Sequence, residues 1–245
     1  MGKIVIGVDS STQSTKAIAW DINGKALAEG RCDIPLHNPS LEKFEQNVED
    51  WWRAFCVSTQ ELCQKIDINE VDGLAISNQR ETLAKLDSSG KEVYPATVWM
   101  DKRSVKEVEE LNSIMGEGRI HEITGRPKDP CPCLYRVLWM KNHEKKFFDQ
   151  IDCFADVQAF LVHRLSGEFN TGWISSDPHG MFDVVNKCWS QEILEQLTID
   201  ESRLPKSFKP GTLIGKVNLS ASKETGLKEG TPIFAAGGDG QLAGL

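Results

Sequence analysis

The sequence predicts an α/β fold built on a mixed β-sheet with helices on both faces. Three observations lead to this prediction. Short β-branched runs alternate along the chain with longer amphipathic segments of helical period. Two early pairs of strand-like runs are joined by tight polar turns. Finally, 40% of the 245 residues are hydrophobic, which suits one large globular domain or two small ones.

Three strands are predicted within the first 30 residues. Apolar residues at 4–8, 17–20 and 26–28 form strand-like runs. A polar stretch from Asp9 to Thr15 separates the first two runs. Asn23 and Gly24 separate the second from the third, and Asn-Gly between two such runs is the strongest short-range signal of a β-hairpin.

Helices and strands then alternate through the rest of the chain. Apolar residues recur at helical spacing over 51–62, with Asn47 or Asp50 as the N-cap. Three prolines within 127–132 predict a loop. The other expected helices span 101–115, 134–143, 154–165 and 189–197; the expected strands span 71–76, 83–86, 93–99 and 232–238; loops are expected over 170–185 and 205–215; a new helix is expected from Leu242.

Charge and cysteine usage limit the classes of partner. The chain has 28 Lys and Arg against 36 Asp and Glu, a net charge of −8, which argues against nucleic acid or an anionic membrane. No apolar run approaches the ~20 residues of a membrane-spanning helix, and no signal peptide precedes the first strand. The seven cysteines are irregularly spaced, as free thiols are in a reducing compartment. We therefore expect a cytoplasmic protein.

Three polar clusters have the composition of binding sites. In the first, Asp9–Lys16, hydroxyls and turn amides can hold phosphate oxygens, Lys16 adds positive charge, and Asp9 can orient a metal ion or its waters. The Gly-rich spacing of a P-loop is absent. The alternative for this cluster is an ordinary polar hairpin tip.

The second cluster, Asn78–Thr82, follows an apolar strand. Arg80 offers a rigid fork of donors and Glu81 offers acceptors, so together they can bind neighbouring hydroxyls of a polyol. Adjacent residues of a strand face opposite ways, so this pair suits a strand end. The alternative is a surface ion pair contributing about 0–1 kcal/mol.

The third cluster is Gly237–Gln241, in which three glycines surround Asp239 and allow close approach of a ligand. A carboxylate at such a turn can accept a proton from a substrate hydroxyl. An Asp cap ahead of a helix explains the same residues equally well. Trp99 can line a cleft near these clusters, although a core tryptophan at a strand end is commoner.

Taken together and in order, the clusters resemble those of the FGGY carbohydrate kinases, and the resemblance spans essentially the whole chain. The carrying segments are Ile6–Lys16, Phe44–Gln46 with Trp51 and Trp52, Asn78–Thr82, Val98–Asp101, Phe182–Val184 with Trp189 and Ser190, and Gly238–Gln241. The resemblance implies a ribonuclease H-like domain of the actin/hexokinase type. It also implies that residues 1–245 are the N-terminal domain, without the C-terminal domain that supplies the adenine site.

The resemblance further implies roles for individual residues. Asp239 is the base that faces the attacking hydroxyl of a sugar or polyol, and Asp9 lies near Mg²⁺. The ATP phosphates contact Thr12, Gln13, Ser14 and Lys16. The acceptor contacts Arg80, Glu81, Trp99, Cys131, Asp239 and Gln241. A homodimer is one open arrangement, and the 245-residue chain alone is expected to be inactive or nearly so.

Departures from the family pattern leave the acceptor open. Ser11 stands where the family usually has Gly, and Cys131 aligns with a substrate-contacting Tyr of glycerol kinases. Pentulose kinases have Met-His where this chain has Arg80-Glu81, although residues 182–184 resemble theirs. Glycerol, a tetritol or pentitol, and a ketopentose are therefore all candidates. Two other functions are open alternatives: a ribonuclease H-type nuclease with Asp9, Glu81 and Asp239 on metal ions, and a non-catalytic sugar-binding module.

Overall fold

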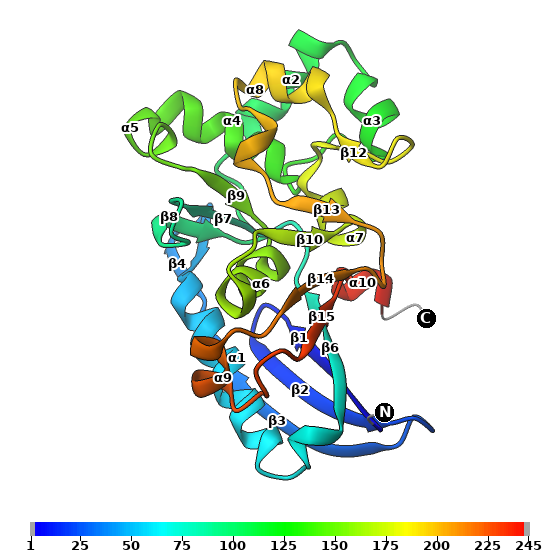
Figure 1. Ribbon diagram of the computed structural model, residues 1–245. Helices are drawn as coiled ribbons and strands as arrows, with labels where there is room; N and C mark the ends of the chain where they lie inside the picture. Colours follow the sequence, from blue (N-terminus) through cyan, green and yellow to red (C-terminus); the bar gives the residue numbers. More distant parts are fainter. Residues whose placement is uncertain (1–2, 243–245) are drawn as a thin grey trace.

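A computed structural model describes residues 3–242, and its lower part is a six-stranded mixed sheet (Figure 1). The strand order is β14-β15-β6-β1-β2-β3. The two pairs β1–β6 and β6–β15 are parallel, and the other neighbours are antiparallel. The strands are β1 (Ile4–Ser10), β2 (Ser14–Asp21), β3 (Ala26–Asp33), β6 (Val71–Asn78), β14 (Leu213–Lys216) and β15 (Pro232–Phe234).

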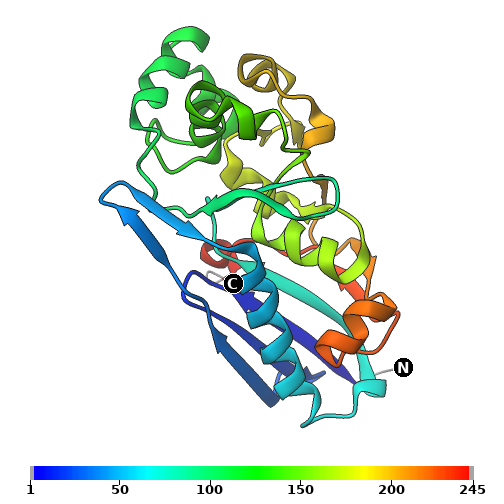
Figure 2. The ribbon, with the colours of Figure 1, turned by 90° about the vertical axis from the view of Figure 1, so that its left-hand side faces the viewer.

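Three helices cover one face of this sheet. Alternate residues of β1 point into the core they form: Ile4, Ile6 and Val8 are buried, whereas Val5 between them is half exposed on the opposite face. The helices are α1 (Val48–Cys63), α6 (Val157–Ser166) and α9 (Leu219–Thr225), and Figure 2 shows α1 running along the strands. On the opposite face the described chain places the short α10 (Asp239–Leu242), which contacts β6.

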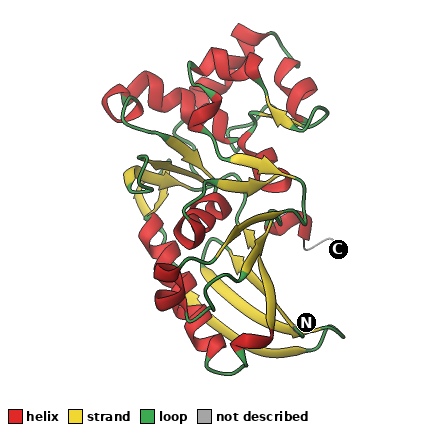
Figure 3. Ribbon diagram, in the orientation of Figure 1, coloured by secondary structure: helices red, strands yellow, loops and turns green. Residues whose placement is uncertain are grey.

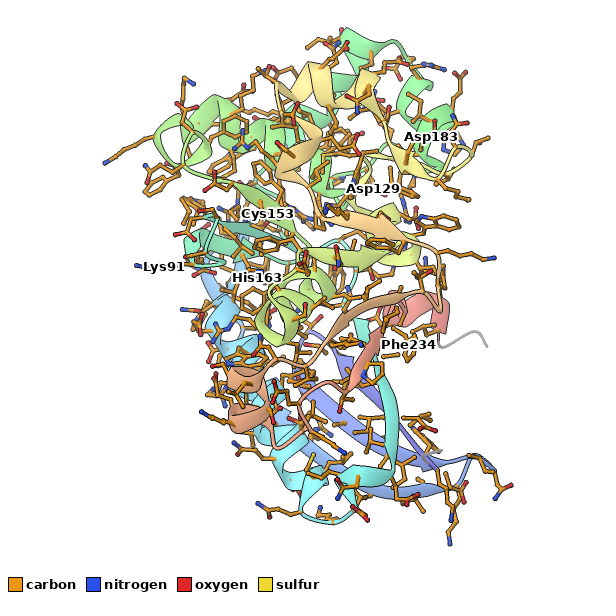
Figure 4. The ribbon with its side chains drawn as sticks, viewed as in Figure 1. Lys91, Asp129, Cys153, His163, Asp183 and Phe234 are labelled. Carbon is orange, nitrogen blue, oxygen red and sulfur yellow. The ribbon has the colours of Figure 1, made fainter. Side chains whose placement is uncertain are left out.

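A second sheet crosses the middle of the molecule (Figure 3). Its order is β4-β5-β8-β7-β9, and every neighbouring pair is antiparallel. The strands are β4 (His37–Ser40), β5 (Lys43–Gln46), β7 (Leu83–Leu86), β8 (Glu92–Thr97) and β9 (Cys153–Ala155). Figure 4 shows His163 of α6 between the two sheets and Lys91 at the turn that joins β7 to β8.

The upper part of the molecule is mainly helical and has its own core. Leu83, Phe154 and Trp189 are among the buried residues of this second core, which is separate from the one beneath the six-stranded sheet. The helices are α2 (Val105–Met115), α3 (Arg119–Thr124), α4 (Cys133–His143), α5 (Lys145–Phe148), α7 (Trp173–Ser176) and α8 (Gln191–Leu197), with short 3-10 turns at Asp177–His179 and Glu201–Arg203. A third 3-10 turn, Ile68–Glu70, directly precedes β6 of the six-stranded sheet. Two small sheets pair β10 (Asn170–Gly172) with β13 (Lys206–Phe208) and β11 (Phe182–Asp183) with β12 (Cys188–Trp189).

The predicted mixed α/β fold is confirmed, as are the opening hairpins and the N-cap at Asn47, whose side chain accepts from the backbone N–H of Glu49. Several boundaries were wrong. The helix expected over 101–115 begins at Val105, because the Asp101 carboxylate instead holds Arg103 in a buried ion pair at 2.7 Å. The first residues of the helix expected over 154–165 belong to β9, since the free edge of β7 recruits them.

The segments expected to be loops also contain regular structure. β10, α7 and β11 lie within 170–185, and β13 and β14 within 205–215. Each of these strands is two to four residues long, which leaves little local pattern, and β10, β13 and β14 pair with segments about 20 or more residues away. The helix expected from Leu242 begins at Asp239, and residues 243–245 lie outside the described chain. None of the helices between residues 3 and 242 is long and apolar enough to span a membrane.

Candidate active site

The three polar clusters meet at one edge of the six-stranded sheet, where the parallel strands β1, β6 and β15 end. The backbone N–H of Gln79 donates to the carbonyl of Ser10 at 2.9 Å, which joins the second cluster to the first. A parallel bridge pairs Asn78 with Gly238 and joins the second to the third. Carboxyl ends of parallel strands collect at one edge of a sheet and form the common ligand site of such folds.

Arg80 and Glu81 pair with each other, and Arg80 reaches Asp177, which lines a cleft together with Gln241. The backbone turns sharply at this pair. Glu81 has φ +47°, a left-handed conformation that is rare for a residue other than glycine, and such strain clusters at functional sites. Its carboxylate lies 3.4 Å from Nη2 of Arg80. The Arg80 side chain passes directly over Gly238, where a Cβ would collide with Cγ of Arg80. The glycine beside Asp239 thus has a specific steric purpose.

Two further charged residues, which the sequence analysis did not identify, complete this cluster. Arg126 lies 3.3 Å from the Glu81 carboxylate and pairs with Asp177 through both Nε and Nη2. Asp177 in turn lies 3.4 Å from Arg80. All four side chains are about one-fifth exposed or less. Arg126 sits in a proline-rich loop and Asp177 in a 3-10 turn, so no strand or helix pattern marked either residue.

The hairpin tip between β1 and β2 carries the residues expected at the phosphates. Ser14 closes the turn, because its carbonyl accepts from the Ser11 N–H at 3.0 Å. Gln13 is exposed, and its carbonyl accepts from Ile34. The Thr12 hydroxyl accepts from Nε1 of Trp99 at 3.2 Å, which connects the hairpin tip to the Trp99 segment. Lys16, by contrast, is ion-paired with Glu29 at 3.1 Å and is partly exposed.

Asp9 fits a role near a cation. It lies opposite Lys16 in the β1–β2 register, so both side chains face the same pocket on the open side of the sheet. One oxygen accepts from the Ser11 hydroxyl, and the other is buried with no partner. An unpaired buried carboxylate oxygen is costly unless a cation or an ordered water satisfies it. Among residues 3–242 no group of three carboxylate, His or Cys side chains is arranged so that it could hold a metal ion.

Trp99 and Cys131 line a second pocket, of about 360 Å³, together with Phe44, Met100 and Pro130. Trp99 is 45% exposed, so it is not the core residue that is the commoner case at a strand end. The backbone N–H of Cys131 donates to Asp129, which Figure 4 labels near the start of α4. Burial, reinforced by the charge of Asp129, raises the pKa of the Cys131 thiol to about 11.

Asp239 is partly buried at the start of α10. Burial raises the pKa of its carboxyl, and the nearby negative charge of Asp9 raises it further. Burial likewise raises the pKa of Glu81, although Arg80 and Arg126 oppose the effect. Gln241 reaches across the site, with Nε2 at 3.5 Å from Asp177. Because Asp177 also pairs with Arg80, the third cluster lies next to the second.

Two buried side chains hold the surrounding loops. Arg136 is fully buried on α4 and donates to the carbonyls of Glu81, Val98 and Cys131. These carbonyls belong to three separate segments of the chain. Gln46 donates to the carbonyl of Thr12 at 2.7 Å and accepts from Gln79 at 2.8 Å, which links the hairpin tip to the second cluster. Neither residue was assigned a role from the sequence, because both act through contacts distant along the chain.

Fold and site together define the class: a mixed-sheet domain of the actin-like ATPase type, whose strand ends bring hydroxyl-, carboxylate- and guanidinium-bearing segments together. A family model described as "FGGY family of carbohydrate kinases, N-terminal domain" matches residues 4–245. The chain belongs to the FGGY family of carbohydrate kinases, and it corresponds to the N-terminal domain of that family.

Curated relatives agree with this assignment. An autoinducer-2 kinase from Yersinia enterocolitica is 27% identical over all of this chain, and a glycerol kinase from Thermococcus kodakarensis is 28% identical over 99% of it. Those matches cover 47% and 49% of the two relatives. The chain thus spans about half the length of the curated relatives it matches.

Solved structures agree on the fold. The crystal structure of a gluconate kinase from Lactobacillus acidophilus superimposes with a TM-score of 0.93 at 27% identity, over 98% of this chain and 49% of that one. A ligand-bound xylulose kinase from the same organism gives the same values. A xylulose kinase from Rhodospirillum rubrum, 22% identical, superimposes with a TM-score of 0.94 over 99% of this chain and 51% of that one, and supports the fold alone.

Proposed function

We propose that this domain is the acceptor-binding half of an ATP-dependent kinase that phosphorylates a terminal hydroxyl of a sugar or polyol. The observation that carries the proposal is the meeting of three segments at one strand edge: the hydroxyl-rich hairpin tip, the Arg80–Glu81 pair and Asp239. The named relatives act on different acceptors, so the acceptor itself remains a choice among glycerol, tetritols, pentitols and ketopentoses.

Arg80 and Glu81 bind acceptor hydroxyls in this scheme. The guanidinium donates to hydroxyl oxygens and the carboxylate accepts from hydroxyl protons, and the strained turn at Glu81 aims both into the cleft. Trp99 covers one side of the acceptor with its ring, whose Nε1 is held by Thr12. Cys131 packs beside it as a small apolar group, and its raised pKa keeps the thiol uncharged at pH 7.

Asp239 accepts the proton of the attacking hydroxyl. The acceptor oxygen forms a bond to the γ-phosphorus of ATP, the bond from that phosphorus to the β–γ bridging oxygen breaks, and ADP leaves. The raised pKa of Asp239 makes its carboxylate a better proton acceptor. Because the transition state of phosphoryl transfer is loose, positioning contributes more than basicity.

The hairpin tip lies against the phosphates. Backbone amides and hydroxyls of Thr12, Gln13 and Ser14 donate to phosphate oxygens, and Lys16 approaches them once it leaves Glu29. A bound Mg²⁺ would neutralise charge on the phosphates, and Asp9, whose second oxygen is buried without a partner, would hold it or its waters. The cysteines of the described chain are free thiols, as suits a reducing cytoplasm.

A panel of polyols and ketoses tests the proposal by ATP consumption. The panel comprises glycerol, erythritol, xylitol and D-xylulose, assayed with the complete polypeptide in which this domain is joined to a nucleotide-binding half. We expect at least one acceptor to release ADP at a rate that depends on its concentration. Absence of acceptor-dependent ADP release across the panel, from a protein shown to be folded, contradicts the proposed function.

The 245-residue chain alone provides a second test. Because the family's adenine site is expected in the other half, we expect acceptor binding by this chain with little or no turnover. A coupled ADP-release assay on the isolated chain measures this directly. Robust turnover by the isolated chain would refute the division of roles between the two halves.

A further inference from the structure

The pair Arg126–Asp177 is part of the site, yet none of the proposed steps uses it. Arg126 donates two hydrogen bonds to the Asp177 carboxylate, one from Nε at 3.1 Å and one from Nη2. Two such bonds fix the orientation of the carboxylate as well as its position. Through its Nη1 the same guanidinium reaches Glu81 at 3.3 Å. An ion pair that only stabilised the fold would not have to contact Arg80 and Glu81, the two residues proposed to bind the acceptor.

The Asp177 carboxylate is accessible from the cleft. Its side chain is 21% exposed, and it lines a pocket of about 300 Å³ together with Trp173, Phe182 and Gln241. An aromatic face beside a carboxylate and an amide is the combination that suits the C–H face and the hydroxyls of a sugar chain. The pocket adjoins the Arg80–Glu81 pair, because Asp177 and Gln241 border both.

Charge balance indicates what this extension accepts. The guanidinium groups of Arg80 and Arg126 are matched by the carboxylates of Glu81 and Asp177, so these four side chains together carry no net charge. Asp239 adds a negative charge nearby, whereas the two other cations, Arg136 and Lys187, donate to backbone carbonyls. An acceptor carboxylate directed at Arg126 would have to displace Asp177 from it, whereas hydroxyls can be added to the cluster without breaking any ion pair.

We propose that Asp177 is a further acceptor-binding residue, that Arg126 positions it, and that this pair restricts the site to uncharged polyhydroxylated acceptors. The proposal rests on the proposed function, because it assumes that Arg80 and Glu81 bind the acceptor. In this proposal a hydroxyl of the bound sugar or polyol donates a hydrogen bond to the Asp177 carboxylate. This hydroxyl is a different one from those that Glu81 binds.

The test compares an uncharged acceptor with an anionic one of similar length. Dissociation constants of xylitol and D-gluconate are measured for the ¹⁵N-labelled 245-residue chain by NMR titration. Asp177→Asn removes a charged hydrogen-bond acceptor and frees Arg126, so we expect xylitol to bind about tenfold more weakly and gluconate to gain relative to xylitol. Arg126→Gln leaves Asp177 unneutralised, so we expect gluconate to lose relative to xylitol.

Opposite shifts of the ratio distinguish recognition from damage, because a misfolded site weakens both ligands together. Arg119→Gln is the matched control: it removes an exposed arginine paired with Glu192 in the helical part and should leave both constants unchanged. If xylitol binds and neither variant moves the ratio, this inference is overturned and the proposed function stands. If the wild-type chain binds neither ligand nor glycerol, erythritol or D-xylulose, the proposed function itself fails.

Discussion

The buried guanidinium of Arg136 donates through Nη2 to the backbone carbonyl of Glu81, the residue at which the chain adopts a left-handed conformation. The same nitrogen donates to Cys131, and Nη1 donates to Val98 beside Trp99 at 2.9 Å. One side chain therefore fixes three of the segments that carry the proposed acceptor contacts. A strained turn persists only where surrounding contacts over-determine it, and these contacts do so.

Replacement of Arg136 by Met should lower stability and weaken acceptor binding together. The carbonyls of Glu81 and Cys131 lose their donor, while that of Val98 keeps the backbone N–H of Asp101, and leaving the two acceptors unpaired costs about 2 kcal/mol or more in the free energy of unfolding. Urea denaturation gives this value, and NMR titration gives the affinity for the acceptor. Arg136→Lys keeps one donor group and should recover part of both losses. Unchanged stability in Arg136→Met would contradict the role of this contact set.

Gln46 makes an independent prediction for the link between the hairpin tip and the second cluster. Gln46→Leu leaves Thr12 and Gln79 without their buried partner, so we expect a loss of about 3 kcal/mol in the free energy of unfolding. In the complete kinase the KM for ATP should rise, because the tip is no longer held. Gln150→Leu, on an exposed turn, is the matched control and should change neither quantity. A stable Gln46→Leu variant with wild-type ATP affinity would be inconsistent with the link.

Asp239→Asn should abolish turnover and leave acceptor binding nearly intact. The amide preserves shape but cannot accept the proton, so we expect a fall in kcat of about 10²-fold or more with little change in acceptor affinity. Initial rates and NMR titration separate the two effects. Asp200→Asn changes an exposed cap of a 3-10 turn and serves as control. A variant at position 239 with wild-type kcat would remove Asp239 from the proposed step.

The pH dependence of stability has opposite signs at two aspartates. Burial raises the pKa of Asp239, so its contribution to stability is fully present below the unfolded pKa of about 4 and is lost as pH rises through the folded value. We therefore expect Asp239→Asn to be relatively more stable at pH 7 than at pH 4. At Asp21 a hydrogen bond from the Lys25 backbone lowers the pKa, so Asp21→Asn should lose stability at pH 7 and recover as pH falls.

Thermal unfolding of both variants and the wild type between pH 4 and pH 7 measures these differences. The two aspartates serve as controls for each other, because general effects of acid move both variants alike. A difference between Asp239→Asn and wild type that does not vary with pH would show that the native environment leaves this carboxyl unperturbed.

Much of the fold could be predicted from local sequence patterns. The Asn-Gly turn, the N-cap at Asn47 and the first strand each depend on neighbours a few residues apart, and the structure has them as predicted. The short strands β9, β13 and β14 were not recognised, because their pairing partners lie far along the chain. A three-residue strand carries too little periodicity to identify it without its neighbour.

The sequence by itself determined the three polar clusters, the order in which they occur and the family they resemble, because each cluster is contiguous. Only the tertiary structure decided that the clusters face one another and that Arg126, Asp177, Arg136 and Gln46 belong with them. Apart from the contact between Arg136 and Cys131, the contacts that these four side chains make within the site join residues 33 to 97 positions apart, as between Gln46 and Gln79 or between Arg80 and Asp177. Burial and strand order set such contacts, and neither is written in the local sequence.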